Sequence, residues 1–128
     1  MKSIKTFFTA SFVILILSSF TGITDDVTSA IKTGNAFELA SFFNGKVDIT
    51  IVDYSDLLSK LEAEKLLYDF FREHEPSDFM VLHHGESSSG LEYTIGKLIT
   101  SNGIYRVSIY INTKESTEYV QQIIIDAE

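Results

Sequence analysis

The sequence predicts a single α+β domain in which N-terminal helices pack on a curved antiparallel sheet. Apolar residues recur at helical spacing in three segments before Pro76, and they alternate with a period of two in the segments after Asp78. The chain has 128 residues, of which 45% are apolar and only one is proline. This length supports one hydrophobic core, and helices followed by a run of strands are typical of α+β architecture.

The N-terminus has the pattern of a signal peptide. Two lysines precede an uncharged apolar run from Phe7 to Phe20. The run is shorter than the roughly 20 residues that span a bilayer, and small side chains allow cleavage after Thr21. We therefore predict a signal peptide at residues 1–21, a single domain at residues 22–128, and export to the periplasm or cell envelope. The alternative is an uncleaved membrane anchor.

Composition excludes several classes of function. Ten lysines and arginines against 18 aspartates and glutamates give a net charge of −8, whereas nucleic-acid binding needs a basic surface. The absence of cysteine excludes disulfides, thiolate metal sites and a cysteine nucleophile. The three histidines show neither HxH nor HExxH spacing. We expect no metal, no cofactor, no nucleic-acid partner and, after signal cleavage, no membrane association.

Two short helices are predicted after the signal peptide. Aspartates at 25–26 cap the first helix, and Gly34 ends it. Asn35 and Glu38 have the spacing of a capping box at the start of the second. Its apolar stripe extends to Phe43, so we expect this helix to continue almost to the next glycine.

A strand and a longer helix follow. Residues 47–51 alternate in polarity as in a half-buried strand, and residues 53–58 are a polar lead-in. Ser59 and Glu62 form a second capping box, and the helix that they begin is closed at Pro76. We expect this helix to be the main packing element against the sheet. Its apolar stripe consists of Ala63, Leu66, Leu67, Phe70 and Phe71.

The rest of the chain predicts a four-stranded meander, with strands at 79–85, 91–100, 104–112 and 118–125. The Asn102-Gly103 pair predicts a type I′ turn that places Ser101 opposite Ile104. One face of the central hairpin then packs on the helices; it consists of Thr94, Gly96, Leu98, Thr100, Tyr105, Val107, Ile109 and Ile111. The other face is too apolar for free solvent, and we expect it to form a homodimer interface. Its main residues are Tyr93, Ile95, Lys97, Ile99, Arg106 and Tyr110.

Several motifs resemble those of a family of exported proteins of unknown function from the envelopes of Gram-negative bacteria. They include Ser59-Lys60-x-x-Ala63-Glu64, Pro76-x-Asp78-Phe79, His83-x-Gly85-Glu86-Ser87 and Asn102-Gly103-x-Tyr105-Arg106-Val107. The family resembles the nuclear-transport-factor-two-like (cystatin-like, ketosteroid-isomerase-like) superfamily. The resemblance implies a cone-shaped fold whose interior often holds a small apolar ligand and whose outer sheet face often forms a dimer. It implies no particular activity.

Few residues are candidates for chemistry. His83 is expected to share its strand face with Phe79 and Val81, so it points into the cone as a base or ligand contact; the alternative is a sheet histidine satisfied by a neighbour. Asp53 is a second catalytic candidate. Tyr105 and His83 are the expected ligand-binding residues. Arg106 either binds an anionic group or pairs with an acidic residue such as Glu92 or Glu118.

The sequence favours a non-catalytic exported domain that binds a small apolar or amphipathic ligand, or a protein partner, and that forms a homodimer. One alternative is a cofactor-free enzyme of the isomerase or dehydratase type with His83 or Asp53 as base. Another is an envelope assembly factor without a pocket. A cone interior with convergent polar groups would favour ligand or enzyme, whereas an interior filled by Phe and Leu would favour an interaction domain.

Overall fold

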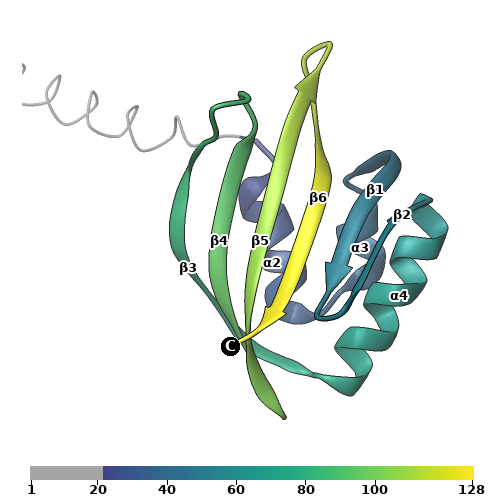
Figure 1. Cartoon of the computed structure of the whole chain (residues 1–128), viewed down its shortest axis with the longest axis vertical. Coiled ribbons are helices and arrows are strands. Elements are labelled where there is room, and N and C mark those ends of the chain that lie inside the picture. The colour runs from purple at the N-terminus through teal and green to yellow at the C-terminus, as the bar shows by residue number, and fades with distance from the viewer. Residues whose placement is uncertain (1–21) are drawn as a thin grey trace, which may run out of the picture.

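The computed structural model describes residues 22–128, so the predicted signal peptide lies outside the described residues (Figure 1). The elements are α2 (Thr24–Thr33), α3 (Ala36–Ala40), β1 (Phe43–Ile51), β2 (Tyr54–Leu58), α4 (Lys60–Glu73), β3 (Pro76–Glu86), β4 (Glu92–Thr100), β5 (Gly103–Lys114) and β6 (Thr117–Ala127). None of the helices in this part of the chain has the length and apolarity that a membrane crossing requires.

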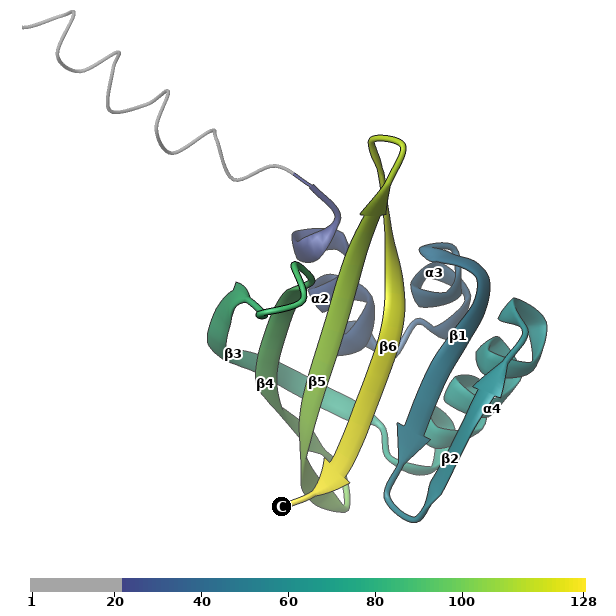
Figure 2. The same cartoon turned by 45° about the horizontal axis from the view of Figure 1, so that its top comes forward.

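The strands form one curved sheet in the order β2-β1-β6-β5-β4-β3, and the helices cover one of its faces (Figures 1 and 2). The predicted meander of β3 to β6 is confirmed. The sheet is mixed rather than purely antiparallel, because β1 pairs in parallel with β6. The meander is thus extended by the β1–β2 hairpin to six strands among the described residues.

Two local predictions are wrong where strand pairing overrides local pattern. The polar lead-in contains the edge strand β2, which pairs with β1 although its side chains lack clean alternation. Helix α3 ends at Ala40 instead of continuing to Phe43. Phe43 is instead the first residue of β1 and pairs with Val120 of β6. The Val120 amide donates a hydrogen bond of 2.9 Å to the carbonyl of the preceding residue, Phe42. Strand pairing with β6, and not the helical spacing of apolar residues, therefore determines the structure at Phe43.

The predicted register of the β4–β5 hairpin is wrong by two residues, but the predicted faces are right. Thr100 pairs with Gly103, so Ser101 and Asn102 lie in the turn. A shift of two residues keeps each side chain on its own face, whereas a shift of one would reverse every face. The inner face is accordingly buried at Thr94, Gly96, Leu98, Thr100, Val107, Ile109 and Ile111, with Tyr105 half-buried.

Helix α4 begins with the predicted capping box and packs against α3, β1 and β2, while α2 packs on β3. The Ser59 side chain accepts from the Glu62 amide, and the Glu62 carboxylate accepts from the Ser59 amide at 3.0 Å. That amide bond holds the pKa of Glu62 below its usual range. The stripe is buried as expected, with Leu66 only half-buried; its buried members are Ala63, Leu67, Phe70 and Phe71.

Candidate functional site

Three polar side chains meet where the end of α4 faces the β4–β5 turn. His74 is the C-cap residue of α4, Asn102 lies in the turn, and Tyr105 points inward from β5. His74 Nδ1 lies 2.6 Å from Asn102 Oδ1 and 3.1 Å from the Tyr105 hydroxyl. The three residues form one hydrogen-bonded cluster between helix and sheet.

The partners of Asn102 determine the tautomer of His74. Asn102 Nδ2 donates a hydrogen bond of 3.1 Å to the Glu73 carbonyl, so Oδ1 is the atom that faces the imidazole. Because Oδ1 only accepts, His74 Nδ1 carries a proton, and in this Nδ1–H tautomer Nε2 is the ring nitrogen that can accept a hydrogen bond. The Tyr105 oxygen shares the Nδ1–H bond, which leaves the Tyr105 O–H group able to donate elsewhere. The cluster therefore offers one acceptor and one donor.

An open pocket of about 290 Å³ adjoins this cluster. Its apolar wall contains Ile51 from β1 together with Leu66 and Phe70 from α4. The Phe70 ring packs against both polar rings, tilted on His74 at 4.7 Å and edge-to-face with Tyr105 at 5.2 Å between ring centroids. An apolar wall beside one donor and one acceptor suits a small amphipathic molecule. The remaining lining residues are Val52, Asp69, Glu73, His74 and Tyr105.

The rim of the pocket includes an unusual backbone conformation. Val52 lies in the β1–β2 turn with φ of 55°, which is rare for a β-branched residue, and its amide donates 2.7 Å to the Ile125 carbonyl. Such conformations are frequent at ligand-binding sites. Asp53, a predicted catalytic candidate, follows Val52 in this turn and is exposed; it is not among the residues that line the pocket.

The prediction that His83 shares a face with Phe79 and Val81 is wrong because a β-bulge intervenes. Val81 pairs with Gly96 and His83 with Ile95, so one extra residue lies on β3 between them. His83 thus lies on the outer face, where Nε2 is 2.8 Å from the Tyr93 hydroxyl. The sheet separates His83 from the pocket, and we leave it out of the candidate site.

Of the predicted ligand-binding residues, Tyr105 alone lines the pocket. Sequence reasoning missed His74, because it follows the helix stripe without a motif, and it assigned Asn102 only to a turn. One signal was available: in an antiparallel hairpin of β3 and β4 the start of β3, just after His74, pairs with the end of β4, just before the Asn102-Gly103 turn, as Pro76 does with Thr100. The ends of α4 and β4 are therefore neighbours in any such hairpin.

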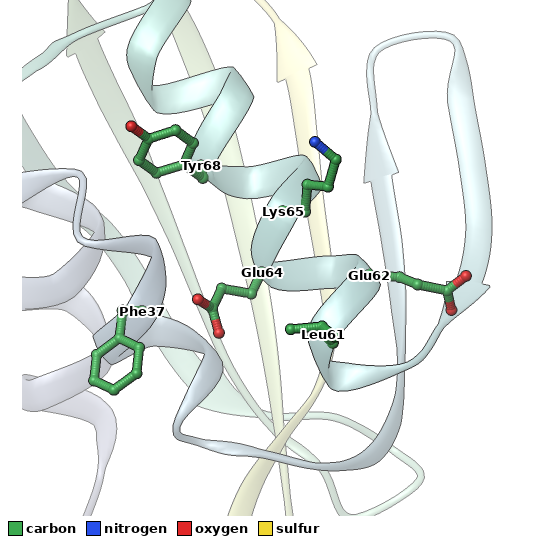
Figure 3. A pocket seen from close by; sticks show the side chains of 6 residues that line it. All are labelled: Phe37, Leu61, Glu62, Glu64, Lys65 and Tyr68. Carbon is green, nitrogen blue, oxygen red and sulfur yellow. The ribbon is translucent and has the colours of Figure 1, made fainter.

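A second, wider groove of about 630 Å³ runs between α3 and α4 (Figure 3). Its apolar side chains are strongly exposed, with Phe37 at 74% and Leu61 at 76%. Figure 3 shows the charged ends of Glu62, Glu64 and Lys65 pointing in different directions. No polar groups converge there, so the groove is a weaker candidate than the His74 pocket.

The outer sheet face is the third candidate surface. The predicted interface residues Tyr93, Ile95, Lys97, Ile99, Arg106 and Tyr110 all lie on this face, and all except exposed Arg106 are half-buried. Lys97 forms an ion pair of 3.2 Å with Glu128, and Arg106 lies opposite Asp126 on β6. Neither Glu92 nor Glu118, the partners considered for Arg106, is its cross-strand neighbour. Lys97 and Arg106 also lie opposite each other, between the Ile95–Ser108 and Ile99–Ile104 pairs. The face is therefore largely apolar and aromatic, with two basic groups that have acidic neighbours.

Nothing in residues 22–128 brings three or more metal-ligating side chains together. The architecture as a whole, with helices on the inner face of a curved, unclosed mixed sheet, defines a cystatin-like domain of the nuclear-transport-factor-two-like class. A cystatin-like domain of unknown function from Nostoc punctiforme supports this class, with a TM-score of 0.61 at 11% identity over 80% of this chain and 70% of that chain.

Within this class the chain belongs to the family described as "Domain of unknown function (DUF4783)", whose model matches residues 24–126. A family member from Bacteroides uniformis is 32% identical, with a TM-score of 0.78 over 84% of this chain and 98% of its own. One from Bacteroides fragilis is 31% identical, with a TM-score of 0.74 over 80% and 95%. No curated protein matches the chain. The predicted resemblance to a family of unknown function with this fold is confirmed.

Proposed function

We propose that this chain is an exported, non-catalytic binding domain that holds a small amphipathic molecule in the pocket between α4 and the sheet. The observation that carries the proposal is the fixed donor and acceptor pair of Tyr105 and His74 beside an apolar wall. The apolar part of the ligand would lie against Ile51, Leu66 and Phe70. Its polar end would exchange hydrogen bonds with the Tyr105 O–H and with His74 Nε2.

Charge narrows the choice of ligand. The carboxylates of Asp69 and Glu73 line the pocket, and no lysine or arginine does. An anionic head group would be repelled there, because like charges at short range are unfavourable. A neutral ligand with a hydroxyl or amide group fits the site better.

The distribution of polar groups supports binding rather than catalysis. An enzyme of the isomerase type needs a base and a separate oxyanion donor that face one substrate. The predicted bases do not meet this requirement, since His83 lies on the outer face and Asp53 in an exposed turn. The interior of the fold is filled by apolar side chains, including Phe71, Phe79 and Leu98, which counts against a ligand enclosed in the cone, so the proposed site is the open pocket beside His74 and Tyr105.

We propose further that two copies associate through the outer sheet face. The apolar and aromatic side chains of this face support the proposal, and its two basic groups have acidic neighbours within the same chain. A symmetric dimer covers such a face with a second copy of itself.

The pocket can be tested with 4-ethylphenol, a small neutral amphiphile, titrated into ¹⁵N-labelled protein. We expect amide shifts at residues that line the pocket, and Tyr105→Phe should weaken binding about fivefold or more, the effect of one lost hydrogen bond. Leu66→Trp should block binding by filling the pocket. Tyr119→Phe is the matched control, since it removes a hydroxyl that bonds Asn112 far along the sheet. Shifts confined to other surfaces, or equal affinity in Tyr105→Phe, would refute the proposal.

A further inference from the structure

The edge strand β3 is exposed in a way that edge strands usually avoid. It ends the sheet on one side, and no strand of residues 22–128 pairs with its outer edge (Figure 1). Three consecutive apolar side chains are exposed on it: Met80 by 46%, Val81 by 50% and Leu82 by 59%. Edge strands are normally protected by charges, prolines or bulges, because their free N–H and C=O groups pair readily with other strands.

The protection that β3 has is incomplete. No charged residue and no proline occurs between Asp78 and Glu86. The bulge at Leu82 interrupts the edge, so an added strand can pair with only a few residues on either side of it. Beside the bulge, Met80 faces the outer side of the sheet and Val81 the inner side. Both are available to the alternating side chains of an added strand.

The end of the β3–β4 hairpin carries uncompensated negative charge. Glu86 and Glu92 are directly opposite each other in the register, an arrangement that is unfavourable for like charges. The ion pairs of residues 22–128 join Lys32 to Asp78 and Lys97 to Glu128, and they include neither glutamate. A cation placed between the two carboxylates would remove this repulsion.

In the register centred on the bulge, a second copy of the chain is a poor occupant of this edge. Antiparallel pairing of two β3 strands about Leu82 would place Asp78 of each copy opposite Glu86 of the other. Carboxylates would then face each other at both ends of the contact. The charge pattern instead favours a strand that carries a basic residue at its end.

We propose that the free edge of β3 binds an extended segment of a partner protein, with apolar side chains in its centre and a lysine or arginine that reaches Glu86 and Glu92. Main-chain hydrogen bonds would provide the attachment, as when a peptide strand is added to a sheet. Contacts with Met80 and Val81 would select apolar residues, and the two glutamates would select the basic one. This edge is separate from the pocket; Met80 adjoins Lys97 of the outer face, but the main-chain pairing proposed here does not depend on the outer-face dimer.

The test uses two capped synthetic hexapeptides of alternating valine and threonine, one with a lysine at each end and one with a glutamate at each end. Each is titrated into ¹⁵N-labelled protein. We expect the lysine peptide to shift the amides of residues 80–86 and 92, and to bind about tenfold more tightly than the glutamate peptide, a difference of about 1.4 kcal/mol. The preference should shrink at high salt, because the charges are solvent-exposed.

Variants test strand pairing at the β3 edge separately from selection of a basic residue by Glu86 and Glu92. Val81→Lys places a charge on the edge and should abolish the shifts, whereas Leu57→Lys, on the opposite edge strand, should leave them unchanged. The double variant Glu86→Gln/Glu92→Gln should reduce the preference for the lysine peptide to less than about twofold. Equal binding of the two peptides, shifts on β2 instead of β3, or concentration-dependent broadening at residues 80–86 in the protein alone would overturn the proposal. The last result would identify a second copy as the occupant.

Discussion

Substituting Gly96 by alanine tests how tightly the inner face is packed around β3 and β4. A Cβ atom at Gly96 would lie 2.4 Å from Phe79 Cζ, 2.6 Å from Phe79 Cε1 and 2.8 Å from the Met80 carbonyl oxygen. Real Cβ contacts are not this short, so either the ring or the backbone must move. Phe79 is only 7% exposed and is surrounded by the core, which leaves little room for the ring.

Overpacking of this kind costs about 1–3 kcal/mol, and the carbonyl contact places Gly96→Ala in the upper part of that range, at about 2–3 kcal/mol. Urea denaturation followed by circular dichroism should show this loss with an unchanged m-value. Gly85→Ala is the matched control. Its Cβ would approach only the end of the half-buried Tyr93 ring, 3.0 Å from the hydroxyl, and we expect a change below about 1 kcal/mol.

A double-mutant cycle identifies the cause of the loss. Phe79→Ala alone should cost about 3–5 kcal/mol. Because it also removes the ring that the new methyl group meets, Gly96→Ala should cost at least 1 kcal/mol less in the Phe79→Ala background. Two outcomes would refute the close contact between Phe79 and Gly96. One is that the two losses add within about 0.5 kcal/mol, and the other is that Gly96→Ala alone costs less than about 0.5 kcal/mol.

Further predictions concern helix α4, the outer face and the N-terminus. Phe70→Ala or Phe71→Ala should each cost about 3–5 kcal/mol in urea unfolding, since these rings are 6% and 5% exposed; a loss under 1 kcal/mol would contradict the packing of α4. Glu62 has a pKa below its ordinary value of 4.5, so its contribution to stability is present above that value and is lost as the pH falls through the lower, folded-state pKa. Glu62→Gln should therefore reduce the pH dependence of the unfolding free energy in this acidic range. An unchanged pH dependence would exclude the Glu62 carboxylate as its source. Ile95→Asp should give monomers in sedimentation with an unchanged circular-dichroism spectrum. A wild-type protein that is already monomeric at tens of micromolar would refute the proposed outer-face dimer. Intact-mass measurement of the protein exported by its native host should show a chain that begins near Gly22, whereas recovery of residues 1–21 with the membrane fraction would reject cleavage.

Local sequence determined the features that neighbouring residues control. The capping box of Ser59 and Glu62 places a side-chain acceptor and a backbone donor within three residues, so it forms wherever the helix forms. Gly34 ends α2 with φ of 67° because glycine adopts the left-handed region without steric cost. The alternation of apolar residues assigned the inner and outer faces of β4 and β5 correctly even though the register was wrong by two residues.

Tertiary structure decided whatever depends on pairing between distant strands. The bulge at Leu82 moved His83 to the outer face, because an extra residue reverses the alternation and no local pattern marks where it is inserted. Pairing with β1 made a strand of residues 54–58, and pairing with β6 ended α3 early. The candidate pocket depends on the same long-range packing. His74, Asn102 and Tyr105 acquire their hydrogen bonds only when the end of α4 docks beside the β4–β5 turn, at a separation of 28 and 31 residues from His74, and short-range periodicity carries no information about that contact.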